Sequence, residues 1–340
     1  MVQQAHKHEL VEVNGSCVDK TRSTYWFEDA TLSLHIEDTR FRIHYSLISR
    51  HSPLFRMLAT SEGEQTVVLV VVEGSGVIAG DHLSLTVKEP VLASDLDALL
   101  GHIYDQDQLM ETSGFPRVAS ILRVSSRKQL DFPEIHAASR CRMEELIPAK
   151  PLMLNPETHP LYEALEIANR YEFPQIRKAI LYMLVTIHHF EYEEMNSDHS
   201  VGTSSAPDTQ PDETAAPPAI SPSSDDSSLS SRDRKICADL LNRLISHFTP
   251  TLYTPATGSH MGCTDRFADM WMPCVIQPSF EDDGVYKPLE TLEKIKGINW
   301  VKEGICEACA EEKRQEWTEE QDKVWVKLDE WIPSTGGLVT

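Results

Sequence analysis

The pattern of apolar and polar residues changes its period within residues 25–58, and this stretch predicts two strands followed by two helices. Leucine and isoleucine alternate with polar residues from Thr31 to Ile36, as in a strand with one buried face. A polar turn follows, and Phe41 and Ile43 then alternate with arginines. The two strands are therefore predicted to form a hairpin.

Beyond Tyr45 the apolar residues recur at helical spacing, on one stripe made of Leu47, Ile48, Leu54, Phe55 and Leu58. The stripe is interrupted by Ser52 and Pro53. Serine is a favoured N-cap residue, and proline is favoured in the first helical turn. The pattern therefore predicts two consecutive helices rather than one kinked helix.

Three more elements are predicted further along the chain. Residues 66–72 are apolar and rich in valine, which fits either a buried strand or an aggregation-prone segment. Residues 83–87 alternate again and predict another strand. Ser94 then suits the N-cap of a helix that ends near Tyr104 and carries acidic residues in its first turn.

Residues 105–159 show no clear period and are locally basic. From Phe115 to Lys150 there are seven Lys or Arg residues against four Asp or Glu, in an otherwise acidic chain. Loops of this length without secondary structure of their own are usually disordered or functional. We expect a long surface insertion without fixed structure, with a basic docking loop and an error in the gene model as the alternatives.

The remaining chain alternates between ordered and polar stretches. Two apolar stripes between Leu161 and residue 188 predict a pair of helices. Residues 191–233 are rich in Ser, Pro, Asp and Ala and predict a disordered acidic linker. Residues 234–332 contain five of the six tryptophans and predict a helical domain with a small aromatic core. Polar tails are expected at 1–24 and 333–340.

Two parts of this pattern resemble the BTB/POZ domain. The first is an aspartate, a hairpin, a Phe-x-x-His step and a Ser-x-x-Phe-x-Met-Leu helix, carried by Asp29, Phe41, His44, Leu47, Ser52, Phe55, Met57 and Leu58. The second is the string LEIANRYEFPQIRKAILYML, which resembles the closing helical hairpin of that domain. The strings FEDATL, DTRFRIHYSLI and HSPLFRML are similar to the BTB proteins of mushroom-forming fungi.

The resemblance implies an α+β fold over residues 25–190, in which a small mixed sheet packs against a helical cluster, with the insertion at about 105–159. BTB domains are protein-interaction modules, so the resemblance implies a non-enzymatic protein with protein partners and no catalytic residues. The family commonly dimerises through the face around its first helix. That face implies partner binding, and a homodimer, through Asp29, His44, Tyr45, Leu47, Ile48 and Phe55.

The resemblance leaves two functions open. One is a substrate adaptor that docks on the cullin scaffold of a ubiquitin ligase while the C-terminal domain holds a client. The alternative is a nuclear factor that assembles transcription-regulatory complexes. In some BTB transcription factors the aspartate and a basic residue after the histidine form a groove for corepressor peptides. Here Asp29 is present but Tyr45 takes the second position, which counts against that groove.

Composition and charge limit the possible partners and the possible cellular location of the protein. The 340 residues carry a formal net charge of −22, which argues against direct nucleic-acid binding through the phosphate backbone. The N-terminus lacks the apolar core of a secretory signal, and no apolar run approaches the roughly 20 residues that span a bilayer. Seven scattered cysteines do not resemble a disulfide framework. We therefore expect an intracellular protein, in the cytoplasm or the nucleus, without membrane contact.

One pattern suggests metal chemistry. Cys306 and Cys309 form a C-x-x-C pair, and the remaining ligands of a zinc site could come from Cys237, Cys263, Cys274 or His260. A second C-x-x-C is missing from the sequence, and a helix around the pair would turn both thiols into a core as small apolar groups. We therefore expect no metal and no cofactor, with a metal-binding C-terminal module as the alternative. No phosphate-binding loop or H-E-x-x-H motif occurs, so no catalytic residues are predicted.

Overall fold

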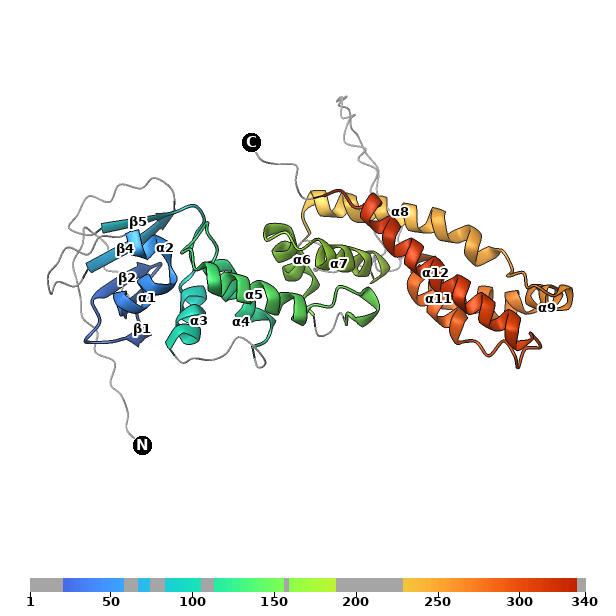
Figure 1. Cartoon of the computed structure of the whole chain (residues 1–340). Coiled ribbons are helices and arrows are strands. Elements are labelled where there is room, and N and C mark those ends of the chain that lie inside the picture. Colours follow the sequence, from blue (N-terminus) through green and yellow to red (C-terminus); the bar gives the residue numbers. More distant parts are fainter. Residues whose placement is uncertain are drawn as a thin grey trace, which may run out of the picture. The chain divides into compact units, whose positions relative to one another are not determined.

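The computed structural model separates into two compact units, Met1–Ile147 and Pro148–Thr340, and each is described by itself. It describes residues 21–57, 67–73, 83–104, 113–155, 159–187 and 229–334 (Figure 1). Most of the predicted linker and of the two tails lies outside these ranges. No helix in the described ranges is long and apolar enough to cross a membrane.

The described residues of the first unit form one mixed sheet of five strands (Figure 1). Its spatial order is β1-β3-β2-β4-β5, made of β1 (Thr21–Trp26), β2 (Leu32–Ile36), β3 (Thr39–Ile43), β4 (Val67–Glu73) and β5 (Leu83–Val87). The predicted hairpin is confirmed, because β2 and β3 pair antiparallel with Leu34 opposite Phe41. All other neighbouring strands pair parallel. The valine-rich segment is β4, which is paired on both edges and so is not left open for aggregation.

The predicted break between two helices is also confirmed. Helix α1 (Tyr45–His51) ends before the fully buried Ser52, and α2 (Pro53–Met57) begins after it. The Ser52 hydroxyl accepts a hydrogen bond from the backbone N–H of Phe55 at 3.3 Å and donates one to the carbonyl oxygen of Leu130 at 2.7 Å. This serine therefore starts α2 and also fixes a turn almost eighty residues further along the chain.

The expected insertion at 105–159 is wrong for the part that the structure describes. Residues 113–155 contain α4 (Phe115–Val124) and α5 (Pro133–Leu146), which pack as a hairpin next to α3 (Ala93–Tyr104). The apolar face of α4 is completely buried, through Val118, Ala119, Ile121, Leu122 and Val124. These two helices belong to the core of the first unit, so this stretch is not a surface loop.

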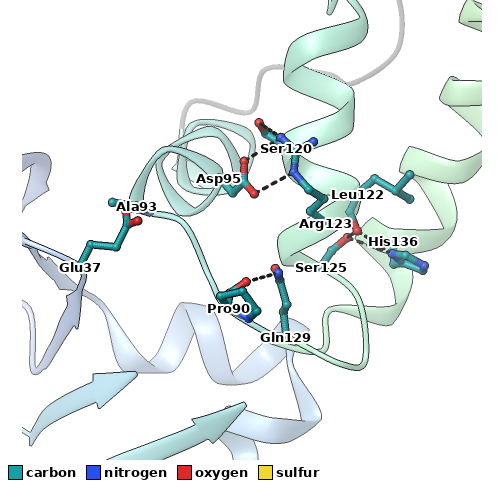
Figure 2. Close-up of polar contacts among 10 residues, drawn as sticks. All are labelled: Glu37, Pro90, Ala93, Asp95, Ser120, Leu122, Arg123, Ser125, Gln129 and His136. Carbon is teal, nitrogen blue, oxygen red and sulfur yellow. Dashed lines mark hydrogen bonds and ion pairs between the residues drawn. The ribbon is translucent and has the colours of Figure 1, made fainter. Parts of the chain in front are cut away.

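The polar contacts of α4 show why its basic residues do not indicate a surface loop (Figure 2). Arg123 points into the unit and donates from Nε and Nη2 to the two carboxylate oxygens of Asp95 on α3, at 3.0 and 3.1 Å. The Asp95 side chain is only 1% exposed. At the start of α3, the Glu37 carboxylate accepts the backbone N–H of Ala93 at 2.8 Å. A basic residue that appeared to belong to a solvated loop is thus one half of a buried ion pair.

The expected domain boundary near residue 190 is corrected as well. The compact first unit ends at Ile147, and the helices α6 (Leu161–Arg170) and α7 (Pro174–Ile187) belong to the second unit. Helix α7 is buried on all sides from Ile176 to Thr186. This is expected for a helix at the centre of a helical unit, and not for a helix that covers one face of a sheet.

The other helices of the second unit follow this pair along the chain. They are α8 (Ser231–Tyr253), α9 (Met261–Trp271), α10 (Gln277–Glu281), α11 (Pro288–Gly297) and α12 (Glu307–Trp331), with the short helical turns η1 (Pro151–Met153), η3 (Met272–Ile276) and η4 (Gly284–Tyr286). From α7, the Tyr182 hydroxyl donates to Glu290 at 2.6 Å, and Lys178 pairs with Asp329 at 2.9 Å. The helical C-terminal domain predicted at 234–332 is therefore one part of a larger helical unit.

The predicted aromatic core is confirmed in the second unit. Trp300 is fully buried, and its ring lies 6.1 Å from that of Trp271, 5.8 Å from that of Trp317 and 5.0 Å from that of Phe267. Contacts of this kind stabilise a core beyond simple burial of area. The aromatic core, as these four residues are called below, ties α9 and α12 to the loop between α11 and α12.

Candidate functional site

Two helix N-termini in the second unit bring four metal-ligating side chains together. His260 is the residue just before α9 and Cys263 is the third residue of that helix. Cys306 and Cys309 hold the same two positions at the start of α12. Side chains at the N-cap and at the third helical position lie next to each other at a helix start, as in a capping box. Each pair therefore converges, and the fold brings the two pairs face to face.

The ligand atoms of these four residues, called the Cys/His cluster below, all lie within 4.8 Å of one another. Nδ1 of His260 is 3.2 Å from Sγ of Cys306, 3.5 Å from Sγ of Cys309 and 4.0 Å from Sγ of Cys263. In a tetrahedral zinc site, bonds of about 2.3 Å to sulfur and 2.1 Å to nitrogen separate the nitrogen and sulfur atoms by about 3.6 Å. The three distances lie on both sides of that value.

The environment around the cluster is tight. A Cβ added to Gly258 would lie 3.1 Å from both Cβ of Cys263 and Sγ of Cys309, so the glycine lets the loop approach the sulfurs without displacing them. The backbone N–H of Gly258 donates to the Thr264 hydroxyl at 3.0 Å, and that hydroxyl donates back to the Gly258 carbonyl at 3.1 Å. Cys309 is completely buried and Cys263 is 8% exposed, whereas His260 is exposed.

The thiols of the cluster differ in their electrostatic surroundings. The pKa of Cys306 is lowered, first by the backbone N–H of Cys309 and then by the Cys309 side chain. For Cys263, a backbone hydrogen bond at Cys306 favours the thiolate, but burial and the neighbouring thiols outweigh it and raise the pKa. The Cys306 thiol at the N-terminus of α12 therefore has a lower pKa than the Cys263 thiol, as expected where backbone N–H groups point at a thiol.

This geometry overturns the reasoning behind the expected absence of a metal site. Both cysteines were expected inside the last helix, but α12 begins at Glu307, so Cys306 precedes it and its thiol turns towards α9. Of the other candidate ligands, Cys237 and Cys274 lie outside the cluster. The sequence did contain a usable signal, because H-x-x-C at 260–263 has the same spacing as C-x-x-C at 306–309.

Of the predicted partner-binding residues, Asp29 and His44 lie together in the first unit. Nε2 of His44 is 3.4 Å from a carboxylate oxygen of Asp29, whose side chain is 82% exposed, and the hydrogen bond from His44 lowers the pKa of Asp29. Tyr104 was not among the predicted partner-binding residues. Its hydroxyl lies 3.0 Å from Nδ1 of His44 and accepts the backbone N–H of His44 at 2.8 Å. The ring of Phe27 packs on both His44 and Tyr104.

The other four predicted partner-binding residues divide into two kinds. Tyr45 and Leu47 are half-buried, so part of each side chain is accessible. Ile48 is only 1% exposed and Phe55 is not exposed at all, so neither can contact a partner directly. The Phe55 ring packs 6.2 Å from that of Phe132 at the start of α5. This correction has a physical cause, because α5 and the turn before it, which were expected to be part of a loop, pack against α1 and α2.

One cavity in the second unit has a volume of 630 Å³ and lies between α6, α7 and the start of α8. Its lining is mainly charged or polar and includes Glu163, Glu166, Asn169, Arg177 and Asp233. Arg177 donates to Asn169 at 2.7 Å, and Asn169 donates to Asp233 at 3.3 Å. None of the lining residues belongs to the Cys/His cluster, so the cavity and the cluster do not form a shared reaction site.

Comparisons with known proteins add no family assignment: no protein-family model and no curated protein matches the sequence.

Proposed function

We propose that the first unit is a BTB-type interaction module and that the chain is a non-enzymatic adaptor for protein partners. The observation that carries the proposal is the cluster of Asp29, His44 and Tyr104. It joins the loop after β1, the start of α1 and the end of α3 at the partly exposed surface where the resembling family binds its partners.

The residues that resemble the BTB pattern support this proposal through the contacts they make. Ser52 holds both the start of α2 and the turn before α5, and Phe55 packs against that same region. His44 directly follows β3, and its backbone N–H donates to the hydroxyl of Tyr104 at the end of α3. Three of the residues that carry the resemblance, His44, Ser52 and Phe55, thus lie at junctions between elements.

The edge of the sheet supports an interaction role for the same surface. Within the described strands, β1 is paired on one side only, with β3, and most of its side chains are exposed or half-exposed. An unpaired strand edge can accept a strand from another chain. Self-association or partner docking through β1 and the neighbouring part of α1 is therefore the mode of assembly that we propose.

The proposed adaptor docks on a cullin-type scaffold through its first unit, and the helical second unit holds the client. Affinity purification of the tagged full-length chain from cells, followed by mass spectrometry, tests this step. We expect cullin scaffold subunits among the enriched proteins, relative to a tag-only control. Enrichment of chromatin proteins instead would favour the nuclear assembly factor, and recovery of chaperones alone would contradict both functions.

A further inference from the structure

We propose that His260, Cys263, Cys306 and Cys309 bind one Zn²⁺ ion in a closed tetrahedral site that holds together the far end of the helical second unit. This inference does not depend on the proposed adaptor function. It rests on four ligand atoms within 4.8 Å of one another, supplied by two segments more than forty residues apart.

The donor atoms select the metal. Three sulfurs and one imidazole nitrogen suit Zn²⁺, whereas Mg²⁺ and Ca²⁺ require oxygen ligands. Four protein ligands fill a tetrahedral coordination shell and leave no position for water or substrate, which is the arrangement of structural rather than catalytic zinc. The site would therefore add stability to the second unit and no hydrolytic chemistry.

The helix N-termini compensate the charge of such a site. Three thiolates and one Zn²⁺ ion carry a net charge of −1, and the cluster lies at the starts of both α9 and α12. The backbone N–H groups and the dipole at a helix N-terminus stabilise negative charge. Two such ends directed at the same four residues make the deprotonated, metal-bound form favourable in this position.

Ordinary core packing does not explain the whole cluster. Cys263 and Cys309 border the aromatic core and could be buried there as thiols. His260, however, is exposed, and yet its Nδ1 lies within 4.0 Å of all three sulfurs. A disulfide between two of the cysteines would leave the third cysteine and the histidine without a role. A shared metal ion gives a role to all four residues.

The ion would link two loops that have little regular structure. One loop runs from Thr254 to His260 and the other from Ile298 to Cys306, and the side-chain hydrogen bonds that join each loop to α9 are few. The second loop also carries Trp300 of the aromatic core. Because an unfolded chain has no preformed site, the free energy of zinc binding adds to the free energy of unfolding. Metal removal should therefore loosen both loops and alter tryptophan fluorescence.

Elemental analysis of the full-length chain tests the proposal. The chain is purified without a metal-affinity step and reconstituted with Zn²⁺ under reducing conditions, and we expect one zinc per chain. Cys309→Ser should reduce the zinc content to near zero. The matched control is Cys274→Ser, because Cys274 lies in the same unit but outside the cluster, and it should retain one zinc per chain.

A second variant separates loss of the ligand from loss of the fold, because Cys309 is buried and its replacement could unfold the unit. His260 is exposed, so His260→Ala should keep the helical circular dichroism while weakening zinc binding more than about 100-fold, beyond the effect of losing an outer-shell contact. Replacement of zinc by Co²⁺ in the wild-type chain should give the visible absorption of tetrahedral thiolate coordination. A wild-type chain without zinc after reconstitution, or with an intact Cys306–Cys309 disulfide under these conditions, would overturn the proposal.

Discussion

Replacing Trp300 with alanine should destabilise the second unit by about 4 kcal/mol, as expected for removal of a fully buried aromatic side chain. The residue has no exposed surface and its ring contacts Trp271, Trp317 and Phe267. Its indole N–H also donates to the carbonyl oxygen of Ile295 at 3.0 Å, and the variant would lose this hydrogen bond.

Denaturant unfolding of the zinc-reconstituted chain, followed by circular dichroism, measures this effect. Val301→Ala is the matched control, because Val301 is the next residue and its side chain is 50% exposed. The control should change the free energy of unfolding by less than about 0.5 kcal/mol. Equal stabilities for the two variants would show that the aromatic core does not hold α9 and α12 together.

Replacing Asp95 with alanine should destabilise the first unit by about 3 kcal/mol, because the change leaves Arg123 without its buried partner. The two residues form two parallel hydrogen bonds at 3.0 and 3.1 Å, and the aspartate is 1% exposed (Figure 2). We place the effect at the lower end of the range for buried pairs, because the Arg123 side chain is 22% exposed and can gain some hydration.

The control for this variant is Asp97→Ala, two residues further along the same helix. Asp97 is exposed and accepts hydrogen bonds from Ser23 at 3.0 Å and Thr24 at 3.5 Å, so its removal should cost less than about 1 kcal/mol. The double variant Asp95→Leu with Arg123→Leu should regain most of the lost stability, because an apolar pair leaves no unpaired charge. If Asp95→Ala and Asp97→Ala proved equally stable, the ion pair would not be what joins α3 to α4.

The local elements of the first unit could be predicted because each depends on neighbouring residues. Alternation in β2 and β3, and the Ser52-Pro53 break between α1 and α2, are patterns of short range. Helices α4 and α5 were not predicted because the contacts that stabilise them are made with residues that are distant in sequence. Arg123 is an ordinary basic residue until Asp95 is placed opposite it, so the locally basic composition of this stretch was attributed to a surface loop.

The Cys/His cluster was missed for a related reason. Its two halves are forty residues apart in sequence, and one half uses a histidine, so the search for a second C-x-x-C did not find it. The decisive fact is where α12 begins. A start one turn earlier would place Cys306 within the helix, whereas the observed start at Glu307 puts it at the N-cap, where its thiol meets His260. Helix boundaries are the feature that sequence patterns define least well.

The domain boundary was misplaced because α6 and α7 resemble the closing helices of the implied family. Their apolar stripes are compatible with either unit, and only the partners decide between them. Tyr182 reaches Glu290 on α11 and Lys178 reaches Asp329 on α12, so α7 is fixed within the second unit. The first unit therefore includes α4 and α5 in place of α6 and α7, and the proposed interaction module ends at Ile147.

The central claim is that the first unit mediates assembly, and sedimentation equilibrium of the full-length chain over a concentration series tests it most directly. We predict reversible self-association with a Kd on the order of micromolar, through the edge of β1 and the accessible part of α1. Leu47→Glu, on the half-buried surface of α1, should shift the equilibrium to monomer, whereas Ala138→Glu, on the exposed surface of α5, should not. A monomer mass for the wild-type chain at every concentration would contradict the claim.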